Sequence, residues 1–332
     1  MFKKGVINIP QFLCHFSSET TMEQFIILEL NEEKELFEKL PDYYRKCYIT
    51  DSDLEERIKN FGPAEQILKK LIPDPGKTMS GEFAEILSYQ LLIDMYKNSD
   101  FNLFGPKKWL WKVDRNEPMK KTDVILFGVK NAEVSSPDDL VVSAEIKSKA
   151  TAGDFHPLQD AIDGAKDDYV KRMAITLSWL EEQYIRLNDS SALNSIKRFV
   201  NAIEPNYGPY KKHFKAITVI DSDMVLVELG REIDYSVKVL KKDWKRIEND
   251  CKELGASYDN DTKKLSFKNV KREDILRSNS RNRDFILYLY DLYNFKLGDY
   301  SDVTIISIKN LKNFYEKVYK NIVTSYKVTA NE

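Results

Sequence analysis

The chain has 332 residues, of which 42% are hydrophobic and 31% are charged, which is typical of one large domain or two unequal ones with a substantial core. No stretch approaches the roughly 18 to 20 apolar residues that a membrane helix needs, and the first residues lack the apolar run of a secretory signal. We therefore expect a cytoplasmic protein without membrane contact.

Cysteine and histidine are too scarce to build a metal centre. The three cysteines, Cys14, Cys47 and Cys251, are scattered without a CxxC pair, so neither a disulfide framework nor a cysteine zinc site is expected. Only three histidines are present. Any metal should therefore be a hard, magnesium-like ion bound by oxygen ligands.

Charge is distributed unevenly along the chain. The formal net charge is −2, but residues 231–332 hold 21 Lys and Arg against 16 Asp and Glu, which gives +5 there and −7 for residues 1–230. The net charge of −2 argues against general attraction of the whole chain to nucleic acid, and the modest difference between the two parts is more typical of a solvated surface than of a binding patch.

The predicted elements begin with an α+β subdomain in residues 1–75, where a strand pattern at 23–30 precedes a charged helix pattern at 31–40. Two prolines and a glycine close this part. A helix follows from residue 80, with Ser80 as its expected N-cap. Three strands are then predicted over residues 109–113, 122–128 and 139–148, forming a meander.

Residues 76–235 are expected to be the core domain, completed by helices over 157–187 and 191–203 and a strand over 214–221. Residues 236–332 are expected to be an α+β extension packed on it. This part begins with a helix at 237–254 and a hairpin at 256–267, then an aromatic-rich segment, and ends with a strand at 302–308 and a helix.

The strand sequence "LVVSAEIKS" combines a buried pattern with two charged residues. Alternation places Ala144 and Ile146 on one face, while Glu145 and Lys147 share the other. Asp123 opens the preceding strand, and antiparallel pairing would bring it beside the end of the next strand. Glu82 and Glu85, in "GEFAEIL", lie three residues apart on a helix that can pack over this end.

These residue types together are suited to metal-assisted phosphodiester chemistry. Two or three carboxylates can hold Mg²⁺, or Mn²⁺ in its place, and a lysine can position the attacking water or the developing charge. An E-x-K pair by itself is common at exposed strand ends. The candidate catalytic residues are Asp123, Glu145, Lys147 and Glu85, with the choice between Glu82 and Glu85 left open.

The chain resembles the PD-(D/E)xK nuclease superfamily through Asp123, Glu145 and Lys147, although Thr122 replaces the proline in the motif's name. More closely, "SGEFAEIL", "KKTDVILFG" and "SAEIKSK" are similar to HamA, the nuclease family of the Hachiman antiphage system. The resemblance implies a restriction-endonuclease-like α/β fold, with a mixed sheet flanked by helices and with N-terminal and C-terminal α+β additions. It also implies metal ligation by Asp123, Glu145, Glu85 or Glu82 and the Ile146 carbonyl, and a HamB-like superfamily 2 helicase partner.

Residues expected to bind nucleic acid directly are Lys149 and the arginines of "RSNSRNR", namely Arg277, Arg281 and Arg283. Trp109 and Trp111 are expected to pack in the core and not to stack on bases.

The sequence therefore predicts a Mg²⁺-dependent DNA nuclease. Two alternatives stay open: a catalytically silent subunit with the nuclease fold that binds nucleic acid or assembles with a partner, and an RNA-cleaving toxin with the same core. The filled acid and lysine positions argue against the silent subunit, whereas no feature of the sequence decides between a DNA and an RNA substrate.

Overall fold

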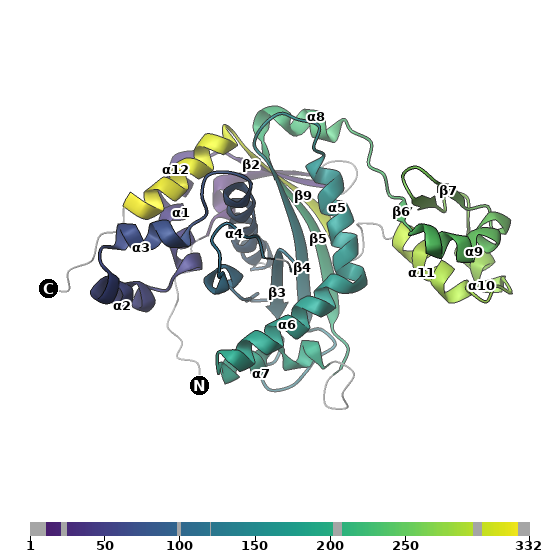
Figure 1. The fold of residues 1–332 in the computed structure, drawn as a ribbon, viewed down its shortest axis with the longest axis horizontal. Coiled ribbons are helices and arrows are strands. Elements are labelled where there is room, and N and C mark those ends of the chain that lie inside the picture. The colour runs from purple at the N-terminus through teal and green to yellow at the C-terminus, as the bar shows by residue number, and fades with distance from the viewer. Residues whose placement is uncertain are drawn as a thin grey trace. The chain divides into compact units, whose positions relative to one another are not determined.

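The computed structural model describes residues 11–20, 25–97, 101–119, 121–201, 208–294 and 301–324. The chain forms two compact units, one made of residues 1–230 together with 300–332 and the other of residues 231–299. The α/β class predicted from the sequence is confirmed by the first unit, which is built on a six-stranded mixed sheet with helices around it (Figure 1).

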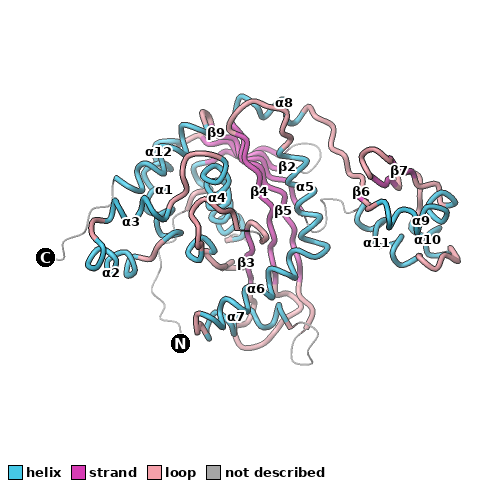
Figure 2. The backbone as a smooth tube through the Cα atoms, in the orientation of Figure 1, coloured by secondary structure: helices cyan, strands magenta, loops and turns pink. Residues whose placement is uncertain are grey.

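The sheet of the first unit has the strand order β1-β2-β9-β5-β4-β3. Its central pairs, β2 with β9, β9 with β5 and β5 with β4, are parallel, while the outer pairs β1–β2 and β3–β4 are antiparallel. Figure 2 shows these strands in magenta. Their bounds are β1 Phe16–Thr20, β2 Phe25–Leu30, β3 Val124–Gly128, β4 Leu140–Lys149, β5 Lys211–Asp221 and β9 Ser301–Ile308.

Two sets of helices cover opposite faces of this sheet. Ala144 and Ile146 of β4 belong to the large apolar cluster that also contains residues of α1, α4 and α12. Glu145 points to the other face because side chains alternate along a strand, and there it meets Gly164 of α5. The helices of this unit are α1 Glu33–Tyr48, α2 Asp51–Phe61, α3 Ala64–Leu71, α4 Lys77–Tyr96, α5 Pro157–Asp167, α6 Met173–Arg186, α7 Ser190–Val200, α8 Val225–Leu229 and α12 Leu311–Thr324.

The division of the chain differs from the three consecutive parts expected from the sequence. Strands β1 and β2 from the first 75 residues pair into the same sheet as the expected core, so they do not form a separate subdomain. Strand β9, from the expected C-terminal extension, lies between β2 and β5. The reason is long-range pairing, which the local pattern of either segment does not reveal.

Two local predictions are also wrong. Residues 109–113 are not a strand, because Lys108–Trp111 form the short 3₁₀ helix η2. Helix α4 begins at Lys77 after Gly76, whose φ of +149° favours glycine, so Ser80 is inside the helix and not its cap. The Ser80 hydroxyl instead forms a hydrogen bond of 2.8 Å with the Ser148 hydroxyl of β4.

The second unit is a small α+β domain with a three-stranded antiparallel sheet in the order β6-β8-β7. The hairpin expected at 256–267 is present as β7 and β8, and Trp244 stacks on Tyr258 with ring centroids 4.3 Å apart. Its elements are β6 Val237–Lys238, α9 Lys241–Glu253, β7 Ser257–Asp259, β8 Lys264–Ser266, α10 Arg272–Arg277 and α11 Arg283–Tyr293.

Candidate metal centre

The antiparallel pair β3–β4 brings Asp123 and Glu145 together. Val124 pairs with Ala144, so the residue before β3 stands beside Glu145. The Asp123 Oδ2 atom accepts a hydrogen bond of 2.8 Å from the Ile146 backbone N–H. Because the N–H and C=O of one strand residue point to the same side, the Ile146 carbonyl also faces Asp123. The sequence expectation that these residues meet at one end of the sheet agrees with this geometry.

Glu145 is a buried carboxylate held by two cations. Its Oε1 lies 2.5 Å from the Lys147 Nζ, and its Oε2 lies 2.5 Å from the Arg172 Nη2. Helix α5 packs so closely here that a Cβ on Gly164 would lie 2.4 Å from the Glu145 side chain. A larger residue at position 164 would therefore displace the carboxylate. This burial is not expected of an ordinary exposed E-x-K pair.

Arg172 was missed by the sequence analysis, and it comes from an unusual element. Residues Asp168–Arg172 form a π-helical turn, labelled η3, between α5 and α6. Arg172 donates to the buried Asp168 carboxylate at 2.5 Å and to the Gly164 carbonyl at 2.7 Å, in addition to Glu145. Single π turns inside helices are frequent at functional sites. The Asp168–Arg172 spacing of four residues is visible in the sequence, but such pairs are common on helix surfaces.

Glu85 is the helical acid whose surroundings match the site. It accepts hydrogen bonds from the Lys108 ammonium at 3.1 Å and the Trp109 indole at 3.2 Å. Burial raises the pKa of Glu85 to about 7, and the nearby Asp123 carboxylate also raises it, against the opposing charge of Lys108. These two partners come from η2, the segment expected to be a strand.

Glu82, one turn earlier on α4, is occupied elsewhere. It pairs with the Lys112 ammonium and accepts a hydrogen bond of 2.7 Å from the Tyr48 hydroxyl. Burial raises its pKa, while the hydrogen bonds from Lys112 and Tyr48 act in the opposite direction. Because the Asp123 charge raises the pKa of Glu85, we assign Glu85, of the two helical acids that the sequence left open, to the site.

The carboxylates of this cluster repel one another. Burial raises the pKa of Glu145 to about 8, and the negative charge of Asp123 raises it further, while Lys147 and Arg172 oppose the shift. A bound cation would relieve this repulsion, and carboxylate oxygens are the ligands that Mg²⁺ and Mn²⁺ prefer. The donor set of Asp123, Glu145 and Glu85 therefore fits a hard divalent ion.

The side chains stand in an ion-paired arrangement that leaves these oxygens apart. Among the described residues, the acid and histidine atoms that lie within 4.8 Å of one another in a group of three belong to His15, Glu32 and Glu35, not to Asp123, Glu145 and Glu85. Lys147 and Arg172 occupy both oxygens of Glu145. Metal binding at the strand ends would thus require Lys147 to release Oε1 of Glu145, while Arg172 keeps its contact with Oε2.

A comparison with protein-family models places the chain in a known family. The HamA family model matches residues 11–322. The chain belongs to the HamA family. Membership supports a role in antiphage defence. No curated protein matches the chain.

None of the described helices of this HamA-family chain is long and apolar enough to cross a membrane. The match covers both compact units, because residues 231–299 lie within its range.

The residues expected to bind nucleic acid fall into two groups. Lys149 is buried, with its ammonium 2.6 Å from the Glu228 carboxylate and 2.7 Å from the Phe155 carbonyl, so its charge is already neutralised. This placement does not fit a direct phosphate contact. Arg277, Arg281 and Arg283 are exposed in the second unit, around the start of α11, and Arg283 lies 3.6 Å from Asp284.

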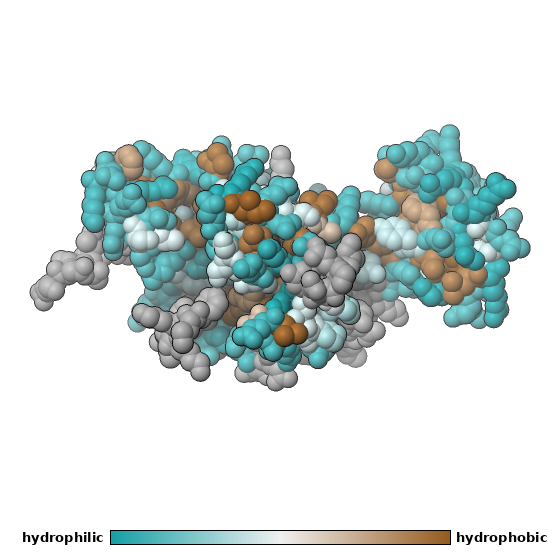
Figure 3. All heavy atoms as spheres, turned by 90° about the horizontal axis from the view of Figure 1, so that it is seen from below, coloured by the Kyte–Doolittle hydropathy of each residue, from teal (hydrophilic) through white to brown (hydrophobic). Residues whose placement is uncertain are grey.

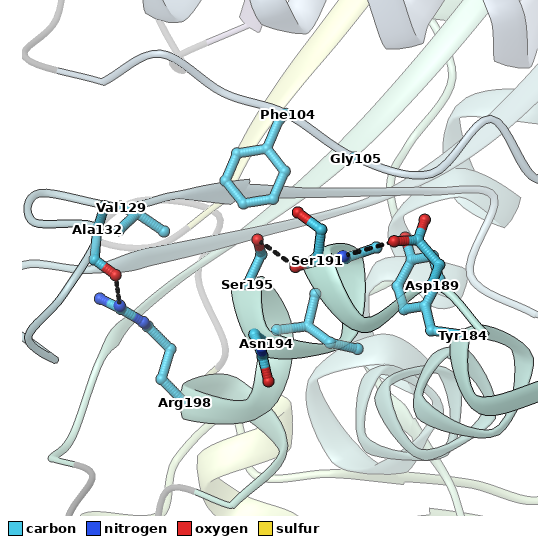
Figure 4. A pocket seen from close by; sticks show the side chains of 12 residues that line it. Phe104, Gly105, Val129, Ala132, Tyr184, Asp189, Ser191, Asn194, Ser195 and Arg198 are labelled. Carbon is cyan, nitrogen blue, oxygen red and sulfur yellow. Dashed lines mark hydrogen bonds between the residues drawn. The ribbon is translucent and has the colours of Figure 1, made fainter. Parts of the chain in front are cut away.

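A cavity of about 860 Å³ lies away from the carboxylates, at the other end of β3. Phe104, Tyr184 and residues of α7 line it (Figure 4). Arg198 is fully engaged there, since it donates to the carbonyls of Asn131, Ala132 and Val134 and to Asp139. The chemistry of the candidate centre therefore does not use this cavity.

Proposed function

We propose that the chain is a metal-dependent nuclease that cleaves DNA phosphodiester bonds as the effector of an antiphage defence system. The observation that carries the proposal is the meeting of Asp123, Glu145 and Lys147 at the joined ends of β3 and β4, with Glu85 coupled to Asp123 from α4. Family membership supports the defence role.

The residues that would hold Mg²⁺ are Asp123, Glu145 and Glu85, with the Ile146 carbonyl facing the same edge. Glu82 is assigned a structural role because Lys112 and Tyr48 occupy it. The bound ion would neutralise charge on the scissile phosphate and lower the pKa of a coordinated water. Mn²⁺ should serve as well, whereas Ca²⁺ should bind without supporting turnover because it tolerates looser geometry.

The chain's own cations have distinct tasks in this proposal. Lys147 is partly exposed beside Glu145, so its ammonium can turn toward the attacking water or the developing negative charge. Arg172 acts as a positioning residue, because it fixes Glu145 through one nitrogen while its Nε stays on Asp168. Lys108 and Trp109 hold Glu85 in the same way.

Control by a helicase partner is the second element of the proposal. A nuclease without sequence recognition would damage its host, and residues 1–230, with a net charge of −7, attract a polyanion weakly. The free chain should therefore bind DNA poorly at physiological salt. A HamB-like superfamily 2 helicase would deliver DNA and restrain cutting until the motor engages damaged or foreign DNA.

The test is a cleavage assay on plasmid and linear DNA with Mg²⁺, using the chain alone and co-expressed with the product of its neighbouring gene, with and without ATP. We expect a stable complex on size exclusion and cleavage that requires the partner, ATP and the metal. Activity that survives excess EDTA would exclude the metal mechanism. Metal binding without cleavage of DNA or RNA in any condition would favour a silent subunit, and cleavage of RNA alone would favour the toxin.

A further inference from the structure

Two tryptophans behave differently from the other two in this chain. Trp109 and Trp244 are buried, with 2% and 5% of their surfaces exposed, whereas Trp111 and Trp179 are both part-exposed. Trp111 and Trp179 contact each other, with ring centroids 5.6 Å apart and planes inclined at 66°. Trp111 also meets Tyr184 edge-on at 5.8 Å. The expectation that both Trp109 and Trp111 lie in the core is therefore correct for Trp109 alone.

Trp179 lies on the helix that supports the carboxylates. Arg172, which contacts Glu145, ends η3 directly before α6, and Thr176 and Trp179 follow it four and seven residues later at helical spacing. The Thr176 hydroxyl accepts from the Thr122 N–H at 3.2 Å, next to Asp123. Seven residues of helix rise by about 10 Å, which is the approximate separation of the Arg172 and Trp179 backbone positions along the helix axis.

Trp111 is positioned by the segment that holds the helical acid. It ends η2, whose Lys108 and Trp109 both contact Glu85. Thus each of the two part-exposed indoles is fixed by an element that also fixes one carboxylate of the site. The aromatic pair and the carboxylates must therefore keep a constant relative position.

Lys121 places a positive charge next to one of the two rings. The Lys121 ammonium lies 5.7 Å from the centre of the Trp179 ring, two residues before Asp123. Lys121, Asp123 and Trp179 line one enclosed space of about 10 Å³, which has room for about one water. Trp179 and Lys121 thus border the same small space as Asp123.

Exposed apolar side chains lie next to these two tryptophans in the sequence, and such side chains favour the binding of a flat ligand. Ile175, one turn before Trp179, is 51% exposed, and Val113 follows Trp111 at full exposure. Most of the face in Figure 3 is hydrophilic, and its hydrophobic patches are separate. Both indoles are part-exposed, so part of their surface is open to another aromatic partner beside the contacts with each other, Tyr184 and Lys121.

We propose that Trp111 and Trp179, together with Lys121, form a stacking platform for an unpaired base of single-stranded DNA beside the carboxylate site. Every nucleobase has a π face, and aromatic side chains next to a cation are the usual means of binding single strands without sequence preference. In a duplex these faces are covered by neighbouring bases. The inference rests on the proposed function and adds a substrate class to it: single-stranded or frayed DNA.

The test measures binding without cleavage, so that it does not depend on nuclease activity. The full chain is titrated in EDTA at low ionic strength with a fluorescently labelled oligothymidylate and with a duplex of equal length. Trp179→Ala and Trp111→Ala should each weaken single-strand binding about tenfold or more, while duplex binding changes less than twofold. Trp179→Phe, which keeps an aromatic face and most of the packing, should retain part of the affinity.

Two controls separate the platform from a packing role. Trp244→Phe removes a buried tryptophan of the second unit and should leave single-strand binding unchanged. Lys121→Ala should weaken both single and double strands and reduce the salt dependence of binding. Equal weakening of single and double strands by Trp179→Phe, or no weakening by either alanine variant in a folded protein, would overturn the platform. The two proposals can fail separately. A lack of cleavage would leave this binding result unchanged, and a lack of selective single-strand binding would leave the cleavage result unchanged.

Discussion

Two clusters of charge lie on the same face of β4, around Lys147 and around Lys149, and they differ in whether their charges cancel. Lys149 pairs with Glu228, which is 0% exposed and also meets the His156 ring at 2.8 Å. In this cluster Lys149 and His156 contact the two oxygens of Glu228, so no carboxylate is left without a partner. Around Lys147, by contrast, Asp123, Glu145 and Glu85 stand close enough for their charges to raise pKa values.

The difference separates a structural ion pair from a candidate site. A buried pair that is fully satisfied contributes mainly when it is broken, because removing one partner strands the other charge. A cluster in which acids repel one another gains from an added cation and is typical of functional sites. Strand β4 therefore carries a structural ion pair at Lys149 and a candidate metal site around Lys147, two residues away on the same face.

The largest expected effect comes from breaking the closed pair. Lys149→Met should lower the free energy of unfolding by about 3 to 5 kcal/mol, because Glu228 is left buried with its charge uncompensated. Urea unfolding followed by circular dichroism measures this. The double variant Lys149→Met with Glu228→Gln should recover part of the loss. A change below about 0.5 kcal/mol in the single variant would show that the pair is not the closed structural element described above.

Lys147→Ala provides the contrasting change on the same face. It should lower the rate of DNA cleavage by the partner complex about 10²- to 10³-fold, the typical cost of losing one group that stabilises developing charge. Its free energy of unfolding should change by less than about 1 kcal/mol, because Arg172 still neutralises Glu145. Cleavage at the parent rate would make Lys147 an ordinary surface residue.

Glu85 and Glu82 allow the same comparison within one helix. Glu85→Gln should weaken Mn²⁺ binding by more than the roughly 10- to 100-fold typical of outer-shell partners. Glu82→Gln should leave Mn²⁺ affinity unchanged but cost about 1 to 3 kcal/mol of stability, because Lys112 loses its buried partner. Calorimetric titration and urea unfolding of both variants give the two readouts. If Glu82→Gln weakens Mn²⁺ binding and Glu85→Gln only lowers stability, the assignment of Glu85 as the helical acid is wrong.

A fourth comparison concerns the pH dependence of stability. The folded-state pKa of Glu145, about 8, lies above its unfolded value near 4.3, so the folded protein binds the proton more tightly. The stability that this proton contributes is complete below about pH 4 and is lost as the pH rises through 8. Glu145→Gln should therefore flatten the decline of stability between pH 5 and 8 in EDTA, measured by urea unfolding. An identical slope in parent and variant would argue against the raised pKa.

The parts of the fold that the sequence predicts are those set by local patterns. The β3–β4 pair is a short-range hairpin with clear alternation, so the meeting of Asp123 with Glu145 follows from the two strands alone. The position of β9 between β2 and β5 does not, because it depends on pairing between segments more than 80 residues apart.

The residues of the candidate site also differ in how well local sequence patterns predict them. Asp123, Glu145 and Lys147 lie in strands whose register is readable, whereas Arg172 reaches Glu145 through a π turn that no periodicity indicates. The choice between Glu82 and Glu85 depends on which acid Lys112 and Lys108 occupy. Lys112 lies within, and Lys108 directly before, the segment 109–113 predicted to be a strand. Lys149 has the composition of a phosphate ligand, but Glu228 neutralises it from 79 residues away.

The most direct measurement of the central claim is Mn²⁺ binding to the full chain, followed by electron paramagnetic resonance, for the parent, Asp123→Asn and His15→Gln. His15 with Glu32 and Glu35 is the rival group whose atoms already lie within 4.8 Å of one another. The account predicts that Asp123→Asn removes the bound Mn²⁺ and that His15→Gln retains it. Mn²⁺ that stays bound in Asp123→Asn and is lost in His15→Gln would contradict a metal centre at the ends of β3 and β4.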